Sequence, residues 1–116
     1  MPKLTIYQKP TCTTCRKVIN ILKEAGMDFE AINYYIDPIP KSKLKSLLKK
    51  MGLEAKDILR TKEPFYKKLK LAKRELTEEQ WIDLMVKYPD LIQRPIVEKG
   101  TKAILARPPE KIREIL

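Results

Sequence analysis

Two cysteines, Cys12 and Cys15, lie between a short apolar run and a segment whose apolar residues recur at helical spacing. The run, residues 4–7, is typical of a β-strand, and Pro10 lies in the connecting loop. Apolar side chains at positions 18, 19, 21 and 22 then predict an amphipathic helix. A strand, a short loop and a helix must therefore follow one another, with Cys12 at the N-terminus of the helix.

A cysteine at a helix N-terminus is expected to be reactive. The unpaired backbone N–H groups and the positive end of the helix dipole favour the thiolate over the thiol. Arg16 and Lys17 add positive charge one turn further on. Because the thiolate is the nucleophilic form, the pattern predicts a redox or nucleophilic role for Cys12, with Cys15 as the second candidate.

Three other roles for the two cysteines find less support. A zinc site takes about four ligands, whereas this chain offers two Cys and no His, so two chains would have to share the metal. A structural disulfide closing so short a loop would stabilise little, and no apolar signal segment precedes the first strand. Burial of the two cysteines in an apolar core is disfavoured by the polar residues on either side of them. We therefore expect no metal.

The composition suits one domain, residues 1–116, because 43% of the 116 residues are hydrophobic. No segment approaches the roughly 20 apolar residues of a membrane span. We expect a cytoplasmic protein, without a membrane partner, that acts as a monomer.

The net charge of +10 favours anionic partners. Most of the excess lies in residues 41–50 and 62–73, where lysines alternate with leucines as they do on the wet face of a helix. A nucleic-acid surface is the alternative interpretation, although these segments hold few aromatic residues for stacking.

After the first helix, which Gly26 ends, residues 29–34 alternate as a second strand does. The prolines of residues 37–40 interrupt the pattern. Apolar residues at helical spacing then predict a helix from 41 to about 51, which Gly52 ends, and short helices are expected at 55–59 and 63–69. Residues 77–80 have the arrangement of a capping box, which predicts a helix that stops before Pro89.

The C-terminal part predicts a hairpin and a helix. Residues 95–98 and 102–106 are strand-like and flank Gly100, which suits a turn that needs a positive φ. Pro108 and Pro109 then open a last helix. The order βαβ, helical block, ββα matches an α/β fold: a thioredoxin-like core with a mixed four-stranded sheet and a helical insertion, about 38–93, between its halves.

Several motifs together resemble the arsenate reductase (ArsC/Spx) family over nearly the whole chain. They are residues 7–16, Leu59 with Arg60, Glu63 with Pro64, Tyr66, Leu69, residues 89–97 with Arg94 and Pro95, and residues 106–108 with Arg107. A lone CxxC would be weak evidence, but arginines at these distances from it make the resemblance specific.

The resemblance implies a nucleophilic Cys12 and an oxyanion, arsenate, bound by Arg60, Arg94 and Arg107. Guanidinium groups are planar, permanently charged, two-pronged donors that suit such an anion, and they would also lower the pKa of the thiol. The resemblance further implies a structural cis bond at Pro95, no bound cofactor, and glutathione with glutaredoxin, or thioredoxin, as the external thiol donor.

Cys15 departs from the pattern of many arsenate reductases, which lack a cysteine there. Regulators of the Spx type carry a CxxC redox switch, whereas Arg107 favours the enzyme. The resemblance thus implies a thiol-dependent arsenate reductase, in which Cys15 or an external thiol resolves the oxidised Cys12. The alternatives are an Spx-like redox-sensing transcription regulator that binds RNA polymerase, and a general thiol–disulfide reductase.

Overall fold

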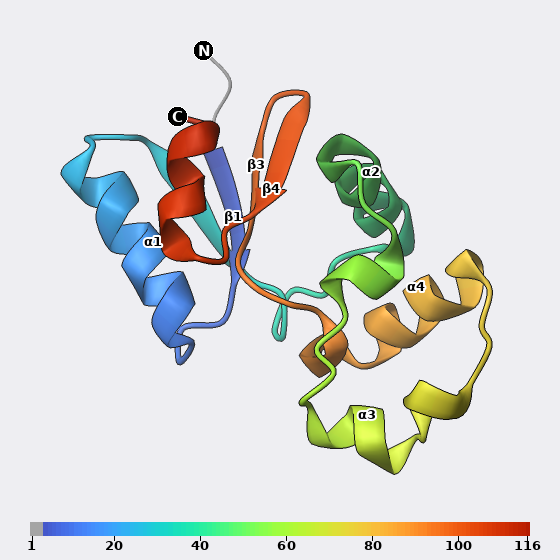
Figure 1. Cartoon of the computed structure of the whole chain (residues 1–116). Helices are drawn as coiled ribbons and strands as arrows, with labels where there is room; N and C mark the ends of the chain where they lie inside the picture. Colours follow the sequence, from blue (N-terminus) through green and yellow to red (C-terminus); the bar gives the residue numbers. More distant parts are fainter. Residues whose placement is uncertain (1–3) are drawn as a thin grey trace. The chain divides into compact units, whose positions relative to one another are not determined.

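The computed structural model describes residues 4–116, which form two compact units (Figure 1). The sheet unit comprises residues 4–37 and Arg94–Leu116, and the helical unit comprises Pro38–Gln93. The assignment of residues 1–116 to one domain, whose first three residues lie outside the described part, stays a prediction.

The sheet unit is built on four strands: β1 (Leu4–Gln8), β2 (Phe29–Asn33), β3 (Ile96–Lys99) and β4 (Lys102–Leu105). Their order is β2-β1-β3-β4. β1 runs parallel to β2 and antiparallel to β3, which pairs antiparallel with β4. The predicted α/β class with a mixed four-stranded sheet is therefore confirmed.

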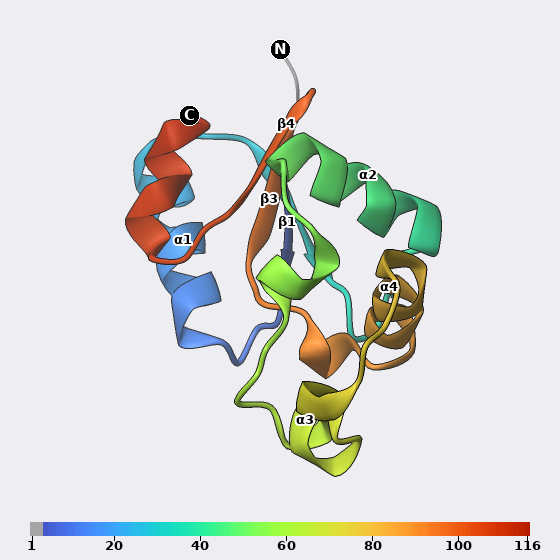
Figure 2. The ribbon, with the colours of Figure 1, turned by 45° about the vertical axis from the view of Figure 1, so that its right-hand side comes forward.

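Helix α1 (Thr13–Glu24) and the 3₁₀ helix η4 (Pro109–Glu114) lie side by side against the sheet (Figure 1 and Figure 2). Their apolar side chains meet those of the strands in one buried cluster: Leu4, Ile6, Val18, Leu22, Val97, Ala106, Ile112 and Ile115. The helical spacing noted in the sequence thus turns Val18 and Leu22 inward, and burial of this face fixes α1 and the loop before it.

The helical unit holds α2 (Lys41–Met51), η1 (Ala55–Ile58), α3 (Pro64–Lys68), η2 (Leu71–Lys73), α4 (Glu78–Lys87) and η3 (Pro89–Leu91). The leucines of α2 at 44, 47 and 48 and the apolar residues of α4 at 81, 82 and 85 are buried. Lys41 Nζ lies 2.7 Å from Glu79 and 2.8 Å from Asp83, on exposed side chains. The Lys41 side chain of α2 is therefore exposed to solvent, as the alternation of lysines and leucines in residues 41–50 predicts.

Local signals explain most element ends. Thr77 Oγ1 accepts a hydrogen bond from the Gln80 N–H at 3.2 Å, and Gln80 Oε1 accepts one from the Thr77 N–H at 2.9 Å, which completes the capping box. Gly52 ends α2 at a φ of 68°, and Gly100 turns the hairpin at a φ of 61°, a region that side chains disfavour.

The structure differs from the sequence prediction in the short helices. The last helix is a 3₁₀ helix of six residues, and the 3₁₀ turns η2 and η3 were not expected. Such turns have no apolar periodicity of their own, so a pattern of 3.6 residues does not detect them. Within residues 4–116, no helix has both the length and the apolar character needed to cross a membrane.

The core of the sheet unit predicts a clear contrast between two apolar side chains. Leu22 is completely buried, so Leu22→Ala should lower the free energy of unfolding by about 2–5 kcal/mol, since it removes apolar burial and leaves a cavity. Ile36 is 77% exposed, and Ile36→Ala should change that free energy by less than about 0.5 kcal/mol. Urea denaturation followed by circular dichroism measures both; equal losses would contradict this core.

Candidate active site

Cys12 is the N-cap residue of α1, with φ −79° and ψ 122°. Its Sγ accepts a hydrogen bond from the backbone N–H of Cys15 at 3.3 Å, and its own N–H donates to the Lys9 carbonyl at 2.9 Å. The Arg16 guanidinium turns back to the Thr11 carbonyl at 3.3 Å and is exposed. The sulfur therefore lies where the unpaired N–H groups of a helix terminus favour negative charge.

The two cysteines are free thiols with opposite properties. Cys12 is 9% exposed and Cys15 is 0% exposed. Burial raises the pKa of Cys12, but hydrogen bonds from Cys15 and the charge of Arg94 outweigh it, so that this pKa is lowered. Burial, followed by the hydrogen bond with Cys12, raises the pKa of Cys15 to about 12. These shifts favour the thiolate at Cys12 and the protonated thiol at Cys15, and the role of Cys12 as nucleophile stays a prediction.

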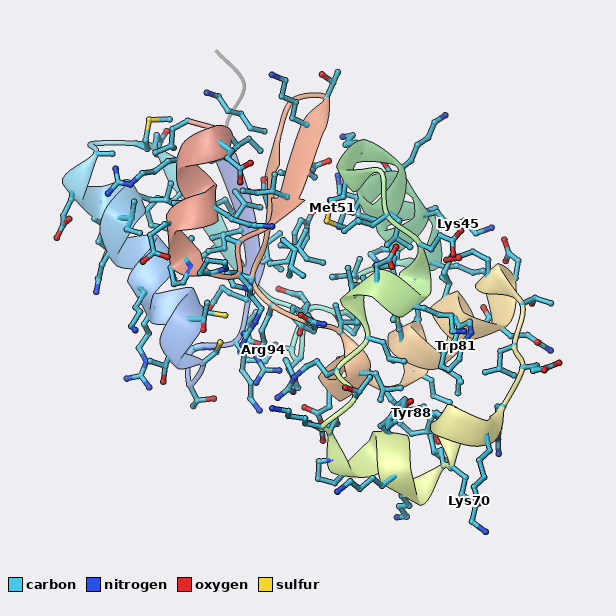
Figure 3. All side chains as sticks on the ribbon, in the orientation of Figure 1. Lys45, Met51, Lys70, Trp81, Tyr88 and Arg94 are labelled. Carbon is cyan, nitrogen blue, oxygen red and sulfur yellow. The ribbon has the colours of Figure 1, made fainter. Side chains whose placement is uncertain are left out.

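Arg94 supplies the positive charge at Cys12. It precedes β3, and its side chain lies beside the N-terminal end of α1 (Figure 3), where its positive charge helps to lower the pKa of Cys12. Its Nη1 donates to the Tyr35 hydroxyl at 3.0 Å, and Tyr34 also hydrogen-bonds with the guanidinium. The buried Nε has no hydrogen-bond partner among the described residues. One donor of Arg94 is therefore left unsatisfied by the part of the chain that the structure describes.

Arg107 joins this group through the backbone of Arg94. Its Nη1 donates to the Arg94 carbonyl at 3.0 Å, and the residue is exposed. The Arg94–Pro95 peptide bond is cis. The Arg107–Pro108 peptide bond is also cis, and only this second cis bond was not expected from the sequence. All the predicted site residues except Arg60 thus gather at one edge of the sheet unit: Cys12, Cys15, Arg94, Pro95 and Arg107.

Arg60 belongs to the helical unit. Its Nη1 donates to Glu63 Oε2 and to the Asp90 carbonyl, both at 3.1 Å, and its backbone N–H donates to the Leu91 carbonyl at 2.7 Å. These contacts hold the side chain within its own unit. Its role in binding an oxyanion stays a prediction.

Sequence reasoning missed Tyr34 and Tyr35, which contact Arg94. They follow β2 directly, and β2 runs parallel to β1 with Asn33 opposite Gln8. Because parallel strands end at the same edge of a sheet, residues just after β2 lie near the loop that carries Cys12. That topological argument was available from the predicted βαβ unit and would have pointed to both tyrosines.

The arrangement offers a nucleophile and an anion-binding donor set. The charge of the Arg94 guanidinium favours the Cys12 thiolate, and the Arg107 guanidinium lies against the Arg94 backbone carbonyl. Within residues 4–116, no three His, Cys, Asp or Glu side chains are grouped so that they could hold a metal ion. The site is thus suited to nucleophilic attack on a small anion.

The chain is similar to several known proteins. The sequence model of the ArsC family matches residues 7–115. The uncharacterized protein YfgD of Escherichia coli is 41% identical over 98% of this chain and 97% of its own length. An arsenate reductase of Escherichia coli is 34% identical over the whole chain and 82% of its own length. The solved structure of an arsenate reductase from Vibrio cholerae, 34% identical, covers 99% of this chain and 98% of its own, with a TM-score of 0.93.

The pKa values of the two thiols predict a difference in their alkylation. The rate follows the fraction of thiolate, and a lowered pKa keeps Cys12 ionised at a pH where an ordinary cysteine is protonated. Cys15, with a pKa of about 12, should remain protonated up to strongly alkaline pH. Iodoacetamide should therefore modify Cys12 first at neutral and mildly acidic pH.

Mass spectrometry of digested samples, taken over time at several pH values, measures this difference. Cys15→Ser serves as the control, because Cys12 should still be modified in it. Equal rates at the two cysteines, or faster modification of Cys15, would refute the assignment of the nucleophile.

Proposed function

The chain belongs to the ArsC family, and from this membership we propose that it is a cytoplasmic, thiol-dependent oxidoreductase that reduces arsenate to arsenite. One observation carries the proposal within the chain itself: the charge of the Arg94 guanidinium favours the Cys12 thiolate, and its buried Nε has no hydrogen-bond partner among the described residues. An anion at that Nε would lie next to the nucleophile.

The oxyanion is proposed to bind between the Cys12 sulfur and the arginines. Arg94 offers its Nε, and Arg107 lies against the Arg94 backbone with an exposed side chain. Arg60 is the third proposed ligand, by its match to the family motif. A tetrahedral anion with several acceptor oxygens suits such planar, permanently charged donors.

In the proposed first step, the Cys12 thiolate attacks the arsenic of bound arsenate. An As–S bond forms and an As–O bond breaks, and the oxygen takes up a proton and leaves as water. The arginines offset the charge of the remaining oxygens. Arsenic keeps its oxidation state in this step.

In the proposed second step, another thiol attacks the Cys12 sulfur. An S–S bond forms, and the electron pair of the As–S bond stays on arsenic, which is reduced and leaves as arsenite. Cys15 is the local candidate. Burial is the largest cause of the raised pKa of Cys15, and the hydrogen bond with Cys12 and the charge of Cys12 raise it further. Formation of the adduct would remove the charge of Cys12. Glutathione with glutaredoxin, or thioredoxin, then returns the disulfide to two thiols.

The hydrogen bond between the two cysteine side chains favours one second candidate, a general thiol–disulfide reductase. Such an enzyme would use the same Cys12 and Cys15 but would not need Arg107. An Spx-like regulator that binds RNA polymerase would likewise rely on the cysteines and not on Arg107. A requirement for Arg107 therefore distinguishes the arsenate reductase from both alternatives.

The first prediction of this proposal concerns turnover. The purified protein should reduce arsenate with glutathione plus glutaredoxin, or with thioredoxin, in an assay that quantifies arsenite. Cys12→Ser should abolish activity, because it removes the attacking sulfur. Cys15→Ser should slow turnover only with donors that depend on an internal disulfide. Failure with every thiol donor, together with tighter binding of RNA polymerase by the oxidised protein, would refute the enzyme.

The second prediction concerns the arginines. Arg60→Ala, Arg94→Ala and Arg107→Ala should each weaken oxyanion binding by about 1.5–3 kcal/mol, the usual contribution of a hydrogen bond to a charged group. Arg→Lys should restore only part of the affinity, since lysine lacks the two-pronged geometry. Titration calorimetry with arsenate or phosphate measures the loss. An alanine variant with unchanged affinity would remove that arginine from the site.

A further inference from the structure

We propose that Tyr35 is a positioning residue, which holds the Arg94 guanidinium beside the Cys12 sulfur and so controls the reactivity of that thiol. Given the proposed function, on which this second part rests, Tyr35 also controls the affinity for the oxyanion. Neither the motif of the family quoted above nor the periodicity of the sequence singles out this residue.

Tyr35 contacts two cations from different parts of the sheet unit. Its hydroxyl accepts a hydrogen bond from Arg94 Nη1 at 3.0 Å, and the Arg94 Cζ lies 5.8 Å from the centroid of its ring. Lys9 Nζ lies 4.5 Å from the same centroid. An aromatic ring attracts cations at such distances. Tyr35 therefore joins the loop before Cys12 to the segment before β3.

The backbone fixes Tyr35 in turn. Its N–H donates to Asn33 Oδ1 at 3.0 Å, an arrangement typical of an Asx-turn at the end of a strand. Its ring packs against that of Tyr34, with centroids 4.9 Å apart, and Tyr34 is only 1% exposed. The partly exposed Tyr35 is thus anchored by a turn on one side and a buried ring on the other.

A neutral partner suits Arg94 for a physical reason. The guanidinium must be held, because an arginine side chain has about 2 kcal/mol of rotamer entropy to lose and neighbouring Lys9 repels it. A carboxylate would hold Arg94 and also neutralise it. Arg60, in contrast, is paired with the carboxylate of Glu63. A phenol fixes the geometry of Arg94 and leaves its full charge to the thiolate and to a bound anion.

Two variants separate the hydroxyl from the ring. Tyr35→Phe removes the acceptor of Arg94 and keeps the ring over both cations, whereas Tyr35→Leu removes both contacts. Tyr66→Phe is the matched control, since it removes a tyrosine hydroxyl other than those of Tyr35 and Tyr34, which hold Arg94. Each variant is made in the full-length chain, and its circular dichroism spectrum is compared with that of the wild type.

Two readouts are needed. The first is the pH profile of Cys12 alkylation by iodoacetamide, which requires no oxyanion. The second is the protection of Cys12 from alkylation by added arsenate or phosphate, which gives a dissociation constant. Tyr35→Phe should move the profile to higher pH and raise this dissociation constant by about 3–10-fold, in line with a weakened hydrogen bond to a charged group. Tyr35→Leu should have a larger effect, and Tyr66→Phe none.

A Tyr35→Phe profile that coincides with the wild type would overturn the positioning role, whatever the result with Tyr35→Leu. A shifted profile, combined with no protection of the wild type by either anion, would support the role of Tyr35 and refute the oxyanion part of the proposed function. The failures of the two proposals are therefore distinguishable.

Discussion

The pairing of the Cys12 sulfur with the Arg94 guanidinium is the interaction on which the rest of the site depends. Burial alone would keep the thiol protonated, and the helix terminus with its Cys15 hydrogen bonds opposes that effect. Arg94 adds a permanent charge and does so without a histidine, which this chain lacks. Within residues 4–116 the Nε of the same guanidinium has no hydrogen-bond partner, which supports the proposal that one side chain both activates Cys12 and binds the anion.

The sheet makes this pairing geometrically simple. β1 leads to Cys12, β2 leads to Tyr34 and Tyr35, and Arg94 precedes β3, which pairs with β1. Loops at one edge of the sheet therefore meet. Burial of α1 and η4 against the sheet keeps the Cys12 loop in place, so that the packing of Leu22, far from the chemistry, supports the position of the sulfur.

Much of the fold followed from local patterns whose physical cause is strong. The Thr77 capping box, Gly52 and Gly100 marked element ends correctly, because each is tied to one hydrogen-bond pattern or one backbone region. The 3₁₀ turns η2 and η3 escaped prediction because they lack apolar periodicity. Cys12 was found from its place before a helix, Arg94 and Arg107 only through the family motif. Tyr35 was missed because its contact with Arg94 depends on strand order rather than on spacing.

The central claim is that Cys12 bonds directly to arsenic within an arginine site. The most direct measurement is X-ray absorption at the arsenic edge, on the Cys15→Ser variant after incubation with arsenate and without a second thiol. The account predicts one sulfur in the first coordination shell of arsenic, together with oxygens, and its loss when Cys12 is also changed to serine. A shell of oxygen atoms alone in the Cys15→Ser variant would contradict it.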